Sequence, residues 1–542
     1  MLDKKDVLSL FPHNTFREYQ VDVIEKVCEM INSDRRIILM ECPTGFGKSP
    51  VNLALCRAMK SSYYLTPQKI LQRQLYQDYK IPLIMGRNNY KCNFFARQRL
   101  TDEGKVIDCS EGMCKRRRNW TCSLREAGEC DYWKAKVECM NAQTALMNFM
   151  YFITEGFTGG GEYSFGDREL VIVDECHFID NWCLNFNSVT ISNRTVPSKI
   201  WEKKLIPFDT LELENIDEVM SWLEKNTIRF AEEEKVTLES MEELGIREVK
   251  RLNKIDDLLY KWNVLKEDIQ KNVWVHQVVR GAFHQSKIVF QPIYVAPFMK
   301  DLVWKRGDYF ILSSATILNP KVFLREVGLE GALGKGLIGT LKVPHTFPIQ
   351  NRLIYTSTIV GKMTREYREQ NLVPAVDMVK KILNKHPNEK GILHMHSYKN
   401  SDDLAELAGE YANRFVFHTE YNREEVLENW ENNGSNNVLV SVNMEEGLDL
   451  AYELSRFQIL FKVGYSYLGD KRVKVRVEAM KERDWYVTQA LKKVVQAYGR
   501  GVRAPDDYCA FYVIDASFHD VIRNEYVPSW FLEAITDKKL EE

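Results

Sequence analysis

The sequence predicts an α/β protein with two parallel-sheet units and two insertions within the first of them. Three observations lead to this prediction. Short apolar runs end at a Gly-containing loop that follows residue 40 and at an acidic pair at 174–175. Similar apolar runs return after about residue 350. Between the loop and the acidic pair, five cysteines lie within residues 92–130, and residues from about 190 to 290 change to a helical pattern.

Composition narrows the class of protein. A chain of 542 residues is too long for one hydrophobic core and is expected to form about three or four domains. No apolar run reaches about 18 residues, and the first residues lack the apolar segment of a signal peptide. We therefore expect an intracellular protein without a membrane partner, cytoplasmic and nucleoid-associated or nuclear depending on the host. The net charge of −2 means that any nucleic-acid contact must be local.

The first unit is predicted from four buried strands. Short apolar runs at 37–40, 62–66, 170–173 and 309–312 have the length and texture of parallel strands. Because helical stretches alternate with these runs, ligands are expected at the carboxyl ends of the strands.

The helical insertion and the second unit follow from the same reasoning. Apolar residues recur at helical spacing over 216–223 and 255–262, with charged residues at the other positions, so a mainly helical insertion is predicted. Runs at 391–395, 437–440 and 457–460 predict strands of a second α/β unit. Two such units suggest a cleft between them.

The loop after the first strand fits most of the Walker A pattern for ATP. Its backbone N–H groups and the following helix are expected to hold phosphates, with Lys48 on the β and γ oxygens and Ser49 on Mg²⁺. Cys42 stands where the general pattern has its first glycine. A Gly-rich turn that binds nothing is the alternative. The ATP-binding loop residues are Thr44, Gly45, Phe46, Gly47, Lys48 and Ser49.

Asp174 and Glu175 close an apolar strand, as a Walker B pair does. Asp174 is expected to hold Mg²⁺ and Glu175 to polarise the water that attacks the γ-phosphate. Acidic strand ends are common and usually solvated. The pair therefore indicates a Walker B motif because a Walker A loop lies upstream of it.

Near the C-terminal end, Arg500 and Arg503 lie three residues apart and are expected on one face of a helix or tight turn. Arginine suits transition-state phosphate charge because its planar fork donates two hydrogen bonds. A solvated basic helix face is the alternative.

Taken together and in order, these motifs resemble those of superfamily 2 helicases. The chain resembles the XPD/DinG family of iron–sulfur DNA helicases over nearly its full length. Residues 16–20 look like the adenine-side element, 66–75 like motif Ia, 313–316 like motif III, 445–450 like motif V and 496–503 like motif VI. The resemblance implies ATP-binding roles for Arg17, Gln20, Gly447 and Asp449. It implies catalytic roles for Lys48, Asp174, Glu175, His177, Gln496, Arg500 and Arg503.

The resemblance also implies a division of the chain. Residues 1–85, 140–190 and 290–340 would form a first RecA-like motor domain, and 341–542 a second. Residues 86–139 would form an iron–sulfur cluster domain and 191–289 a helical arch domain, because the family carries insertions at these two places.

A [4Fe–4S] cluster takes four thiolates, and the chain offers five candidates. Cys92 and Cys130 resemble the family's first and last ligands in their sequence contexts. Spacing does not choose the other two. The lack of CxxC pairs counts against a zinc ribbon, and zinc or a ligand-free remnant are the alternatives. The candidates are Cys92, Cys109, Cys114, Cys122 and Cys130.

Positive charge and flat rings interleave in the same segment, as in single-strand binding sites, where charge follows phosphates and rings stack on bases. A solvated basic loop is the alternative. The expected DNA-binding residues are Lys115, Arg116, Arg117, Arg118, Trp120, Trp133 and Lys134, with Lys136 beside them.

These observations lead to one functional expectation: an ATP-dependent DNA helicase, active as a monomer with Mg²⁺ and a [4Fe–4S] cluster on single-stranded and forked DNA. Movement from 5′ to 3′ is implied by the resemblance alone. The rivals are an ATPase or translocase that does not unwind, an enzyme acting on RNA-containing substrates, and a scaffold with an inactive ATPase fold.

Overall fold

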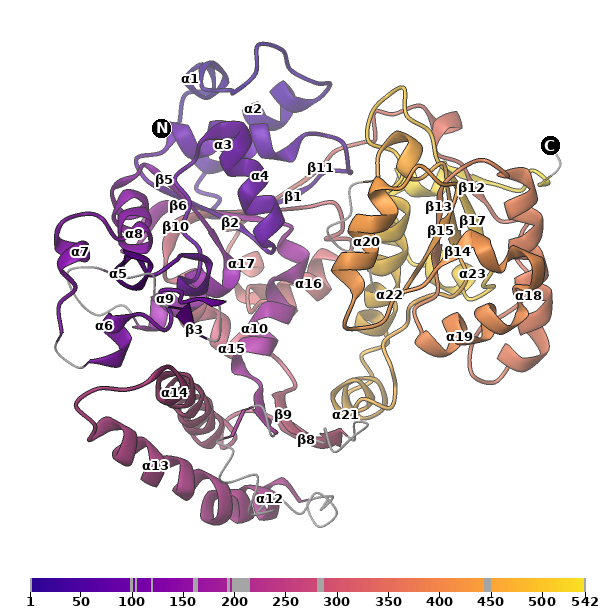
Figure 1. The fold of residues 1–542 in the computed structure, drawn as a ribbon. Coiled ribbons are helices and arrows are strands. Elements are labelled where there is room, and N and C mark those ends of the chain that lie inside the picture. The colour runs from indigo at the N-terminus through magenta and orange to yellow at the C-terminus, as the bar shows by residue number, and fades with distance from the viewer. Residues whose placement is uncertain are drawn as a thin grey trace.

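The computed structural model describes residues 2–97, 101–102, 105–117, 120–158, 164–192, 195–196, 215–279, 287–442 and 450–540. Two α/β units lie side by side, and a helical insertion extends from them at the bottom of the view (Figure 1). No helix in these ranges has the length and apolar character that a membrane span requires.

The first unit is built on a six-stranded sheet in which all strands are parallel. The strand order is β11 (Ile338–Lys342), β1 (Ile37–Glu41), β10 (Gly307–Ser314), β6 (Arg168–Asp174), β2 (Ser62–Thr66) and β5 (Thr144–Asn148). The four strands predicted from apolar runs are all present. The prediction of an α/β fold with parallel sheets is therefore confirmed, and β1, β10 and β6 bring the Gly-containing loop beside the acidic pair.

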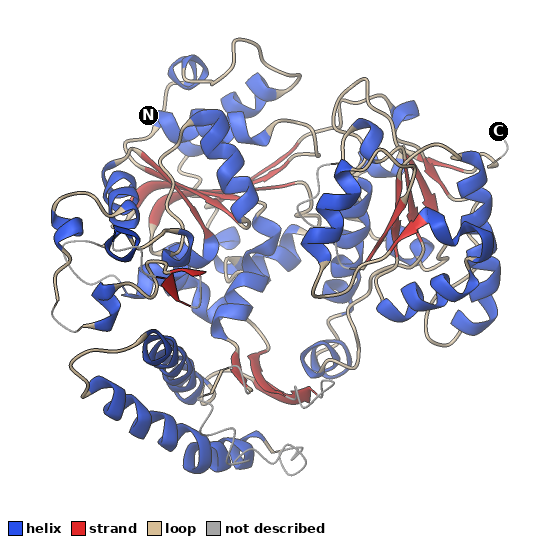
Figure 2. Cartoon of the chain, viewed as in Figure 1, coloured by secondary structure: helices blue, strands red, loops and turns tan. Residues whose placement is uncertain are grey.

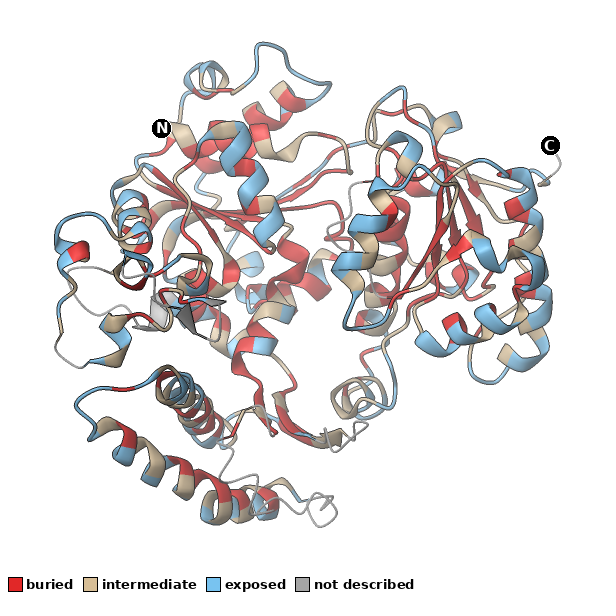
Figure 3. Cartoon of the chain, viewed as in Figure 1, coloured by how far each residue is buried: buried red, intermediate tan, exposed pale blue. Residues whose placement is uncertain are grey.

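Both faces of this sheet are covered, which explains why its strands are nearly continuous apolar runs. Successive strand residues point to opposite faces. Ile38 and Met40 belong to one core, while Ile37 and Leu39 belong to the other. Figure 3 shows the strands of this sheet mostly in the red of buried residues. The surrounding helices are α1 (Lys4–Ser9), α2 (Gln20–Asn32), α3 (Lys48–Ala58), α4 (Lys69–Tyr79), α9 (Phe149–Thr158), α10 (Ile179–Asn187), α15 (Ala296–Met299), α16 (Pro320–Glu326) and α17 (Glu330–Gly334).

The second unit contains a seven-stranded parallel sheet (Figure 2). Its order is β14 (Phe415–Val416), β15 (Val438–Ser441), β13 (Gly391–His394), β16 (Phe457–Leu460), β17 (Ala510–Val513), β12 (Ile354–Tyr355) and β18 (Ile535–Thr536). The three strands predicted here are present. The helices are α18 (Arg368–Lys385), α19 (Tyr398–Leu407), α20 (Arg423–Asn432), α21 (Lys471–Lys474), α22 (Arg483–Tyr498), α23 (Phe518–Ile522) and α24 (Ser529–Leu532).

Apart from α8, which has 11 residues, the described elements of the cysteine-rich insertion between β2 and β5 are short. They are α5 (Asn93–Arg97), β3 (Thr101–Asp102), β4 (Lys105–Val106), α6 (Met113–Arg116), α7 (Ser123–Glu126) and α8 (Asp131–Asn141). So little regular structure means that side chains in the interior must hold these segments together.

The second insertion is mainly helical, as predicted, with α12 (Ile216–Leu223), α13 (Arg229–Glu239) and α14 (Ile246–Asp268). Its base is an antiparallel sheet that helical periodicity did not reveal, with β9 (Lys287–Pro292) between β7 (Val189–Ile191) and β8 (Trp274–Val279). The two chain segments that connect the insertion to the first unit, β7 and β9, therefore pair with each other, and this pairing fixes the insertion at its base.

The helical insertion touches the cysteine-rich insertion at its far end. Leu244 donates its backbone N–H to the carbonyl of Arg116 at 2.8 Å, and Arg117 pairs with Glu243 at 2.5 Å. At its base, Gln277 of β8 accepts from the backbone N–H of Lys471 at 2.8 Å. The insertion thus bridges the first and second units.

A candidate nucleotide-binding cleft

The Gly-containing loop has the shape that phosphate binding requires. It lies between the carboxyl end of β1 and the first turn of α3, so the helix N-terminus faces the site. Gly45 and Gly47 have φ of +80° and +83°, a region that side chains rarely tolerate. These two glycines allow the loop to turn tightly around a phosphate.

Arg17 and Gln20 hold this loop from behind. Arg17 Nη1 donates to the carbonyl of Gly45 at 2.6 Å, and Gln20 Nε2 donates to the carbonyls of Phe46 and Gly47, both at 3.1 Å. Gln20 is only 2% exposed, and its Oε1 accepts from the N–H of Arg17 at 2.8 Å. These contacts hold the loop through its carbonyls, so they do not use its N–H groups, which phosphate binding requires.

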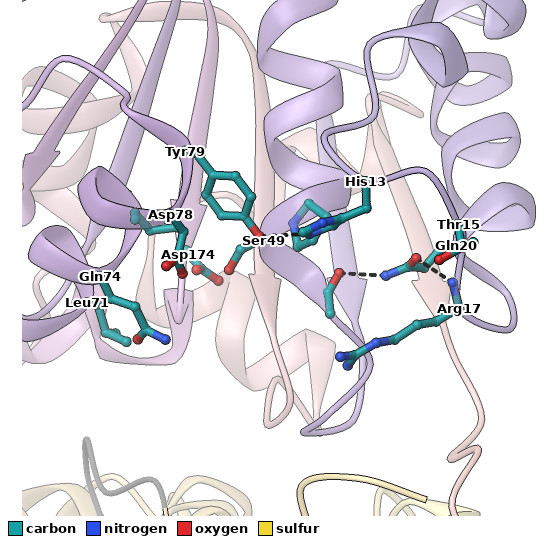
Figure 4. A pocket seen from close by; sticks show the side chains of 13 residues that line it. His13, Thr15, Arg17, Gln20, Ser49, Leu71, Gln74, Asp78, Tyr79 and Asp174 are labelled. Atoms are coloured by element: carbon teal, nitrogen blue, oxygen red, sulfur yellow. Dashed lines mark hydrogen bonds between the residues drawn. The ribbon is translucent and has the colours of Figure 1, made fainter.

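A large hollow adjoins the loop on the same side. It has a volume of about 430 Å³. Figure 4 shows its two walls with the Mg²⁺ candidates Ser49 and Asp174 between them. One wall comes from the segment before α2 and the other from α4. The residues of these walls include His13, Thr15, Arg17, Gln20, Leu71, Gln74, Asp78 and Tyr79. The hollow lies next to the phosphate loop, where the nucleoside of a bound nucleotide would be expected.

Lys48 and Glu175 form a close ion pair at 2.9 Å in the centre of the site. Burial opposes the charge of Glu175, but Lys48 and other nearby groups, including Arg500, together outweigh burial and lower the pKa of Glu175 to about 2. Burial likewise opposes the charge of Lys48, yet Glu175 and Asp174 raise its pKa above the ordinary value. Glu175 has a φ of +51°, which is unusual for a residue with a side chain and is found where function demands it. Both groups therefore stay charged and fixed.

Asp174 is held by two hydroxyl groups. Tyr64 donates to Oδ2 at 3.1 Å and Ser313, at the end of β10, donates to Oδ1 at 2.9 Å. Burial and the neighbouring carboxylate of Glu175 raise the pKa of Asp174. Asp174 is thus oriented but electrostatically unsatisfied, which suits a carboxylate that receives a divalent cation.

His177 connects the acidic pair to the second unit. Burial lowers its pKa to about 3, so the ring is neutral. Gln496 of α22 donates to Nε2 at 2.5 Å, so Nδ1 carries the proton and donates to Ser314 Oγ at 2.6 Å. Gln496 also donates to Thr316 Oγ1 at 3.3 Å. Through Gln496, the second unit therefore contacts both the segment that follows the acidic pair and the segment that follows β10.

The two predicted arginines lie just after α22, Arg500 in a turn and Arg503 in the irregular segment that follows. A cavity of about 160 Å³ is lined by Lys48, Ser49 and Glu175 from one unit and by Arg500 and Arg503 from the other. A Cβ on Gly499 would lie 3.0 Å from Thr44 Oγ1, so the glycine allows the two units to approach closely here. Of the expected ATP-binding residues, only Gly447 and Asp449 lie outside the described residues.

The neutral histidines His177, which is buried, and His345, which is half-buried, predict a dependence of stability on pH. The pKa of His177 and that of His345 are both lowered by burial from 6.5 to about 3. The unfolded chain therefore binds more protons than the folded chain below pH 6.5, so the free energy of unfolding falls as the pH decreases from 6.5 towards 3.

We expect the thermal midpoint to be lower at about pH 5 than at about pH 7. His345→Gln should reduce this difference, because one of the groups is removed, whereas His13→Gln at an exposed position is the control. An equal slope in wild type and His345→Gln would contradict the assignment.

All five candidate cysteines line one cavity of about 200 Å³ in the cysteine-rich insertion. A hydrogen bond from Cys109 lowers the pKa of Cys130, and thiolate is the form that binds metal. Gly112 is close to Cys92, since a Cβ there would lie 3.1 Å from its Sγ. Among the described residues, however, no three ligating side chains are close enough to hold a single metal ion. The thiols are gathered but not arranged around a common point.

Several of the expected DNA-binding side chains have other contacts. Arg116 lies over Phe95 at 4.5 Å, Arg117 pairs with Glu243, and Lys136 is buried. Trp120 and Trp133 line the cysteine cavity, and Arg125 stacks on Trp133 at 3.6 Å. Lys115 and Lys134 are exposed, and Arg118 lies outside the described residues. The basic stretch thus contributes to joining the two insertions as well as to the surface.

Sequence reasoning did not identify the role of Tyr64, which donates to Asp174, or of Phe347, which lies against the phosphate loop. Tyr64 is brought to the site by the order of the strands, and Phe347 by the path of the linker, so no sequence motif marks either residue. Ser313 and Ser314 were found as a motif, but their hydrogen-bond partners could not be read from it.

Comparisons with known proteins agree with this geometry. Residues 13–190 match the family model for the type III restriction enzyme, res subunit, and residues 379–534 match the helicase C-terminal domain. The first covers the phosphate loop and the acidic pair, and the second covers the arginines.

Two curated relatives are helicase subunits XPD of the general transcription and DNA repair factor IIH. The chain is 27% identical over 114 residues to the Schizosaccharomyces pombe protein and 26% identical over 117 residues to the Saccharomyces cerevisiae protein. These matches cover 19% and 20% of this chain and only 15% of each relative's length.

The solved structures extend the likeness to the whole fold. An XPD helicase structure superposes with a TM-score of 0.64 at 14% identity, covering 96% of this chain and 98% of that chain. The structure of S. tokodaii Xpd4 gives a TM-score of 0.57 at 14% identity, covering 96% and 99%. At this identity the likeness establishes the fold.

Proposed function

We propose that this chain, an XPD-like superfamily 2 helicase by its fold and its ordered motifs, is an ATP-driven motor that moves on single-stranded DNA and unwinds duplex DNA. The observation that carries the proposal is the composition of the phosphate cavity. Lys48, Ser49 and Glu175 line one side, and Arg500 and Arg503 line the other. Hydrolysis of a phosphoanhydride needs these charges at these places.

In this mechanism, Ser49 and Asp174 would hold Mg²⁺, and Lys48 would meet the β and γ oxygens. Mg²⁺, when bound, neutralises phosphate charge. Glu175 keeps its negative charge because its pKa is about 2, so it can orient and polarise the attacking water. Arg500 and Arg503 would stabilise the charge that develops on the transferred phosphoryl group.

The contacts across the cleft explain how hydrolysis could become movement. Gln496 reaches His177 and Thr316, and Gly499 packs against Thr44. These contacts exist only while the units are close together. We propose that ATP stabilises this closed arrangement and that loss of the γ-phosphate releases it, so the two units step along one strand.

We further propose that the cysteine cavity holds a [4Fe–4S] cluster. The fit rests on donor chemistry: five thiols line one cavity in an insertion with little regular structure. The cluster, when bound, supplies four covalent links among these segments. Cys92 and Cys130 follow the family's sequence contexts, and two of Cys109, Cys114 and Cys122 would complete the set.

The proposed partners are ATP, single-stranded DNA and forked DNA, with the protein acting as a monomer in the cytoplasm or nucleus and moving from 5′ to 3′. Lys115, Lys134 and the remaining basic residues near the cavity would contact the strand. A single-strand-stimulated ATPase assay beside a forked-duplex unwinding assay tests the proposal. ATPase without unwinding would indicate a translocase, and equal action on an RNA second strand would broaden the substrate.

Removal of either arginine should slow hydrolysis with little effect on ATP affinity. Arg500→Ala and Arg503→Ala are each expected to lower kcat, because both side chains act mainly on transition-state charge, which in related phosphoryl transfers contributes about 10³-fold or more. Steady-state kinetics with saturating single-stranded DNA measures this.

Arg523→Ala, on an exposed side chain of the same unit, is the matched control for the arginine variants. Normal kcat in both Arg500→Ala and Arg503→Ala would mean that the second unit takes no part in hydrolysis.

A further inference from the structure

The linker between the two units runs against the phosphate loop. It connects β11 with β12 and carries Phe347, whose ring is only 5% exposed. A Cβ on Gly45 would lie 2.5 Å from Cε2 and Cζ of this ring, far closer than atoms approach. Gly45 therefore needs its hydrogen side chain for two reasons: its φ of +80° and the ring that occupies the space beside it.

The same ring also contacts the arginine segment. Phe347, Val502 and Cys509 form a small buried apolar cluster of their own. Val502 lies between Arg500 and Arg503 in the chain, and the carbonyl of Arg503 would lie 3.4 Å from a Cβ on Gly45. One side chain of the linker thus contacts Gly45 in one wall of the phosphate cavity and Val502 between two residues of the other wall, yet it is not itself part of the cavity lining.

The backbone around Phe347 is held in place by buried polar groups. Its carbonyl accepts from Arg352 Nε at 3.1 Å, and its N–H donates to His345 Nδ1 at 3.1 Å. Arg352 is 2% exposed and also donates to the carbonyl of Trp530 at 2.6 Å and to Glu533 at 2.5 Å. The backbone that carries the ring cannot move away from the phosphate loop without disturbing this network.

We propose that Phe347 is a positioning residue for ATP hydrolysis. Its ring holds Gly45 in the phosphate-binding shape and ties that shape to Val502, so closure of the cleft and formation of the phosphate cradle occur together. The residue acts through the loop and does not touch the nucleotide. This inference rests on the ATPase activity proposed above.

The test is Phe347→Ala, measured by steady-state ATPase with saturating single-stranded DNA. We expect kcat/KM for ATP to fall about 10-fold to 100-fold, because small displacements of a binding group have effects of this size. Most of the change should appear in KM, since the loop binds phosphates in the ground state and the transition state alike. Single-strand affinity should stay within about twofold of wild type, because the proposed strand contacts lie in the cysteine-rich insertion, away from Phe347, and distant sites act almost independently.

The matched control is Phe415→Ala, which removes the ring of a buried residue (7% exposed) from β14 of the second unit. Equal losses in the two variants, or an unchanged kcat/KM in Phe347→Ala, would overturn the proposal. If Phe347→Ala does not fold, Phe347→Leu keeps apolar contact and should show a smaller loss in the same direction.

A double variant separates positioning from general destabilisation. Gly45→Ala alone should be severely impaired, because its Cβ meets the Phe347 ring. Adding Phe347→Ala removes that clash and should recover part of the activity, although the unfavourable φ remains. No recovery would contradict the contact. A wild-type protein without ATPase activity would instead refute the proposed function, whatever the variants do.

Discussion

Lys48→Ala is expected to lower ATP turnover by about 10²-fold to 10³-fold, the usual cost of removing one preorganised charge donor from a transition state. Lys48 is the cation paired with Glu175 at 2.9 Å, and it faces the phosphate cavity. Single-strand binding should remain, because the proposed strand contacts lie in the cysteine-rich insertion. ATPase rate and single-strand affinity, measured on the same preparation, check both statements. Lys26→Ala, at an exposed position of α2, is the control.

Lys48→Ala is also expected to lower the stability of the protein. Removing Lys48 leaves two adjacent carboxylates, Asp174 and Glu175, in a buried site without their cation, and unpaired buried charges destabilise strongly. The double variant Lys48→Ala with Glu175→Gln removes one of these charges. Its thermal midpoint should therefore recover towards wild type while its ATPase stays low. Turnover above about a tenth of wild type in Lys48→Ala would exclude the proposed role, since that loss is smaller than one donor accounts for.

Much of the fold could be predicted because the predicted strands, such as β1, β13 and β16, are short apolar runs buried on both faces. The runs at 62–66 and 457–460 match β2 and β16 residue for residue. Where one face of an element is polar, local sequence predicted less. The sheet at the base of the helical insertion was not expected, because β8 and β9 pair only with each other and with β7, and their burial is uneven.

Some residues of the candidate site could likewise be predicted from the sequence, and others could not. Lys48, Asp174 and Arg500 follow from motifs, because phosphate chemistry restricts residue type and spacing. The contacts of Gln496 and Phe347 could not be predicted, since they depend on how the second unit meets the first. Arg117 shows the opposite case: its charge predicted a nucleic-acid contact, while the structure pairs it with Glu243 of the other insertion. Charge alone does not distinguish a phosphate partner from a carboxylate.

Cys92→Ser and Cys130→Ser are each expected to remove the cluster and abolish duplex unwinding while ATPase activity survives at least in part. The insertion has only short elements around its cavity, so its order depends on what joins the thiols. The phosphate site is formed by other residues and should keep its shape. Iron and sulfide analysis of anaerobically purified protein, with the visible absorption spectrum, measures the cluster independently of activity.

The remaining three thiols provide an internal test of the four-ligand cluster. A [4Fe–4S] cluster needs four thiolates, so replacement of one among Cys109, Cys114 and Cys122 should leave the iron content nearly unchanged, and replacement of either of the others should reduce it. Cys139→Ala is the matched control, because Cys139 is fully buried in α8 outside the cavity. Zinc in place of iron would assign a different metal to the same thiols. Full iron content in both the Cys92 and Cys130 variants would exclude them as ligands, and strand separation would then have to be sought in the contact between the two insertions, where Arg117 meets Glu243.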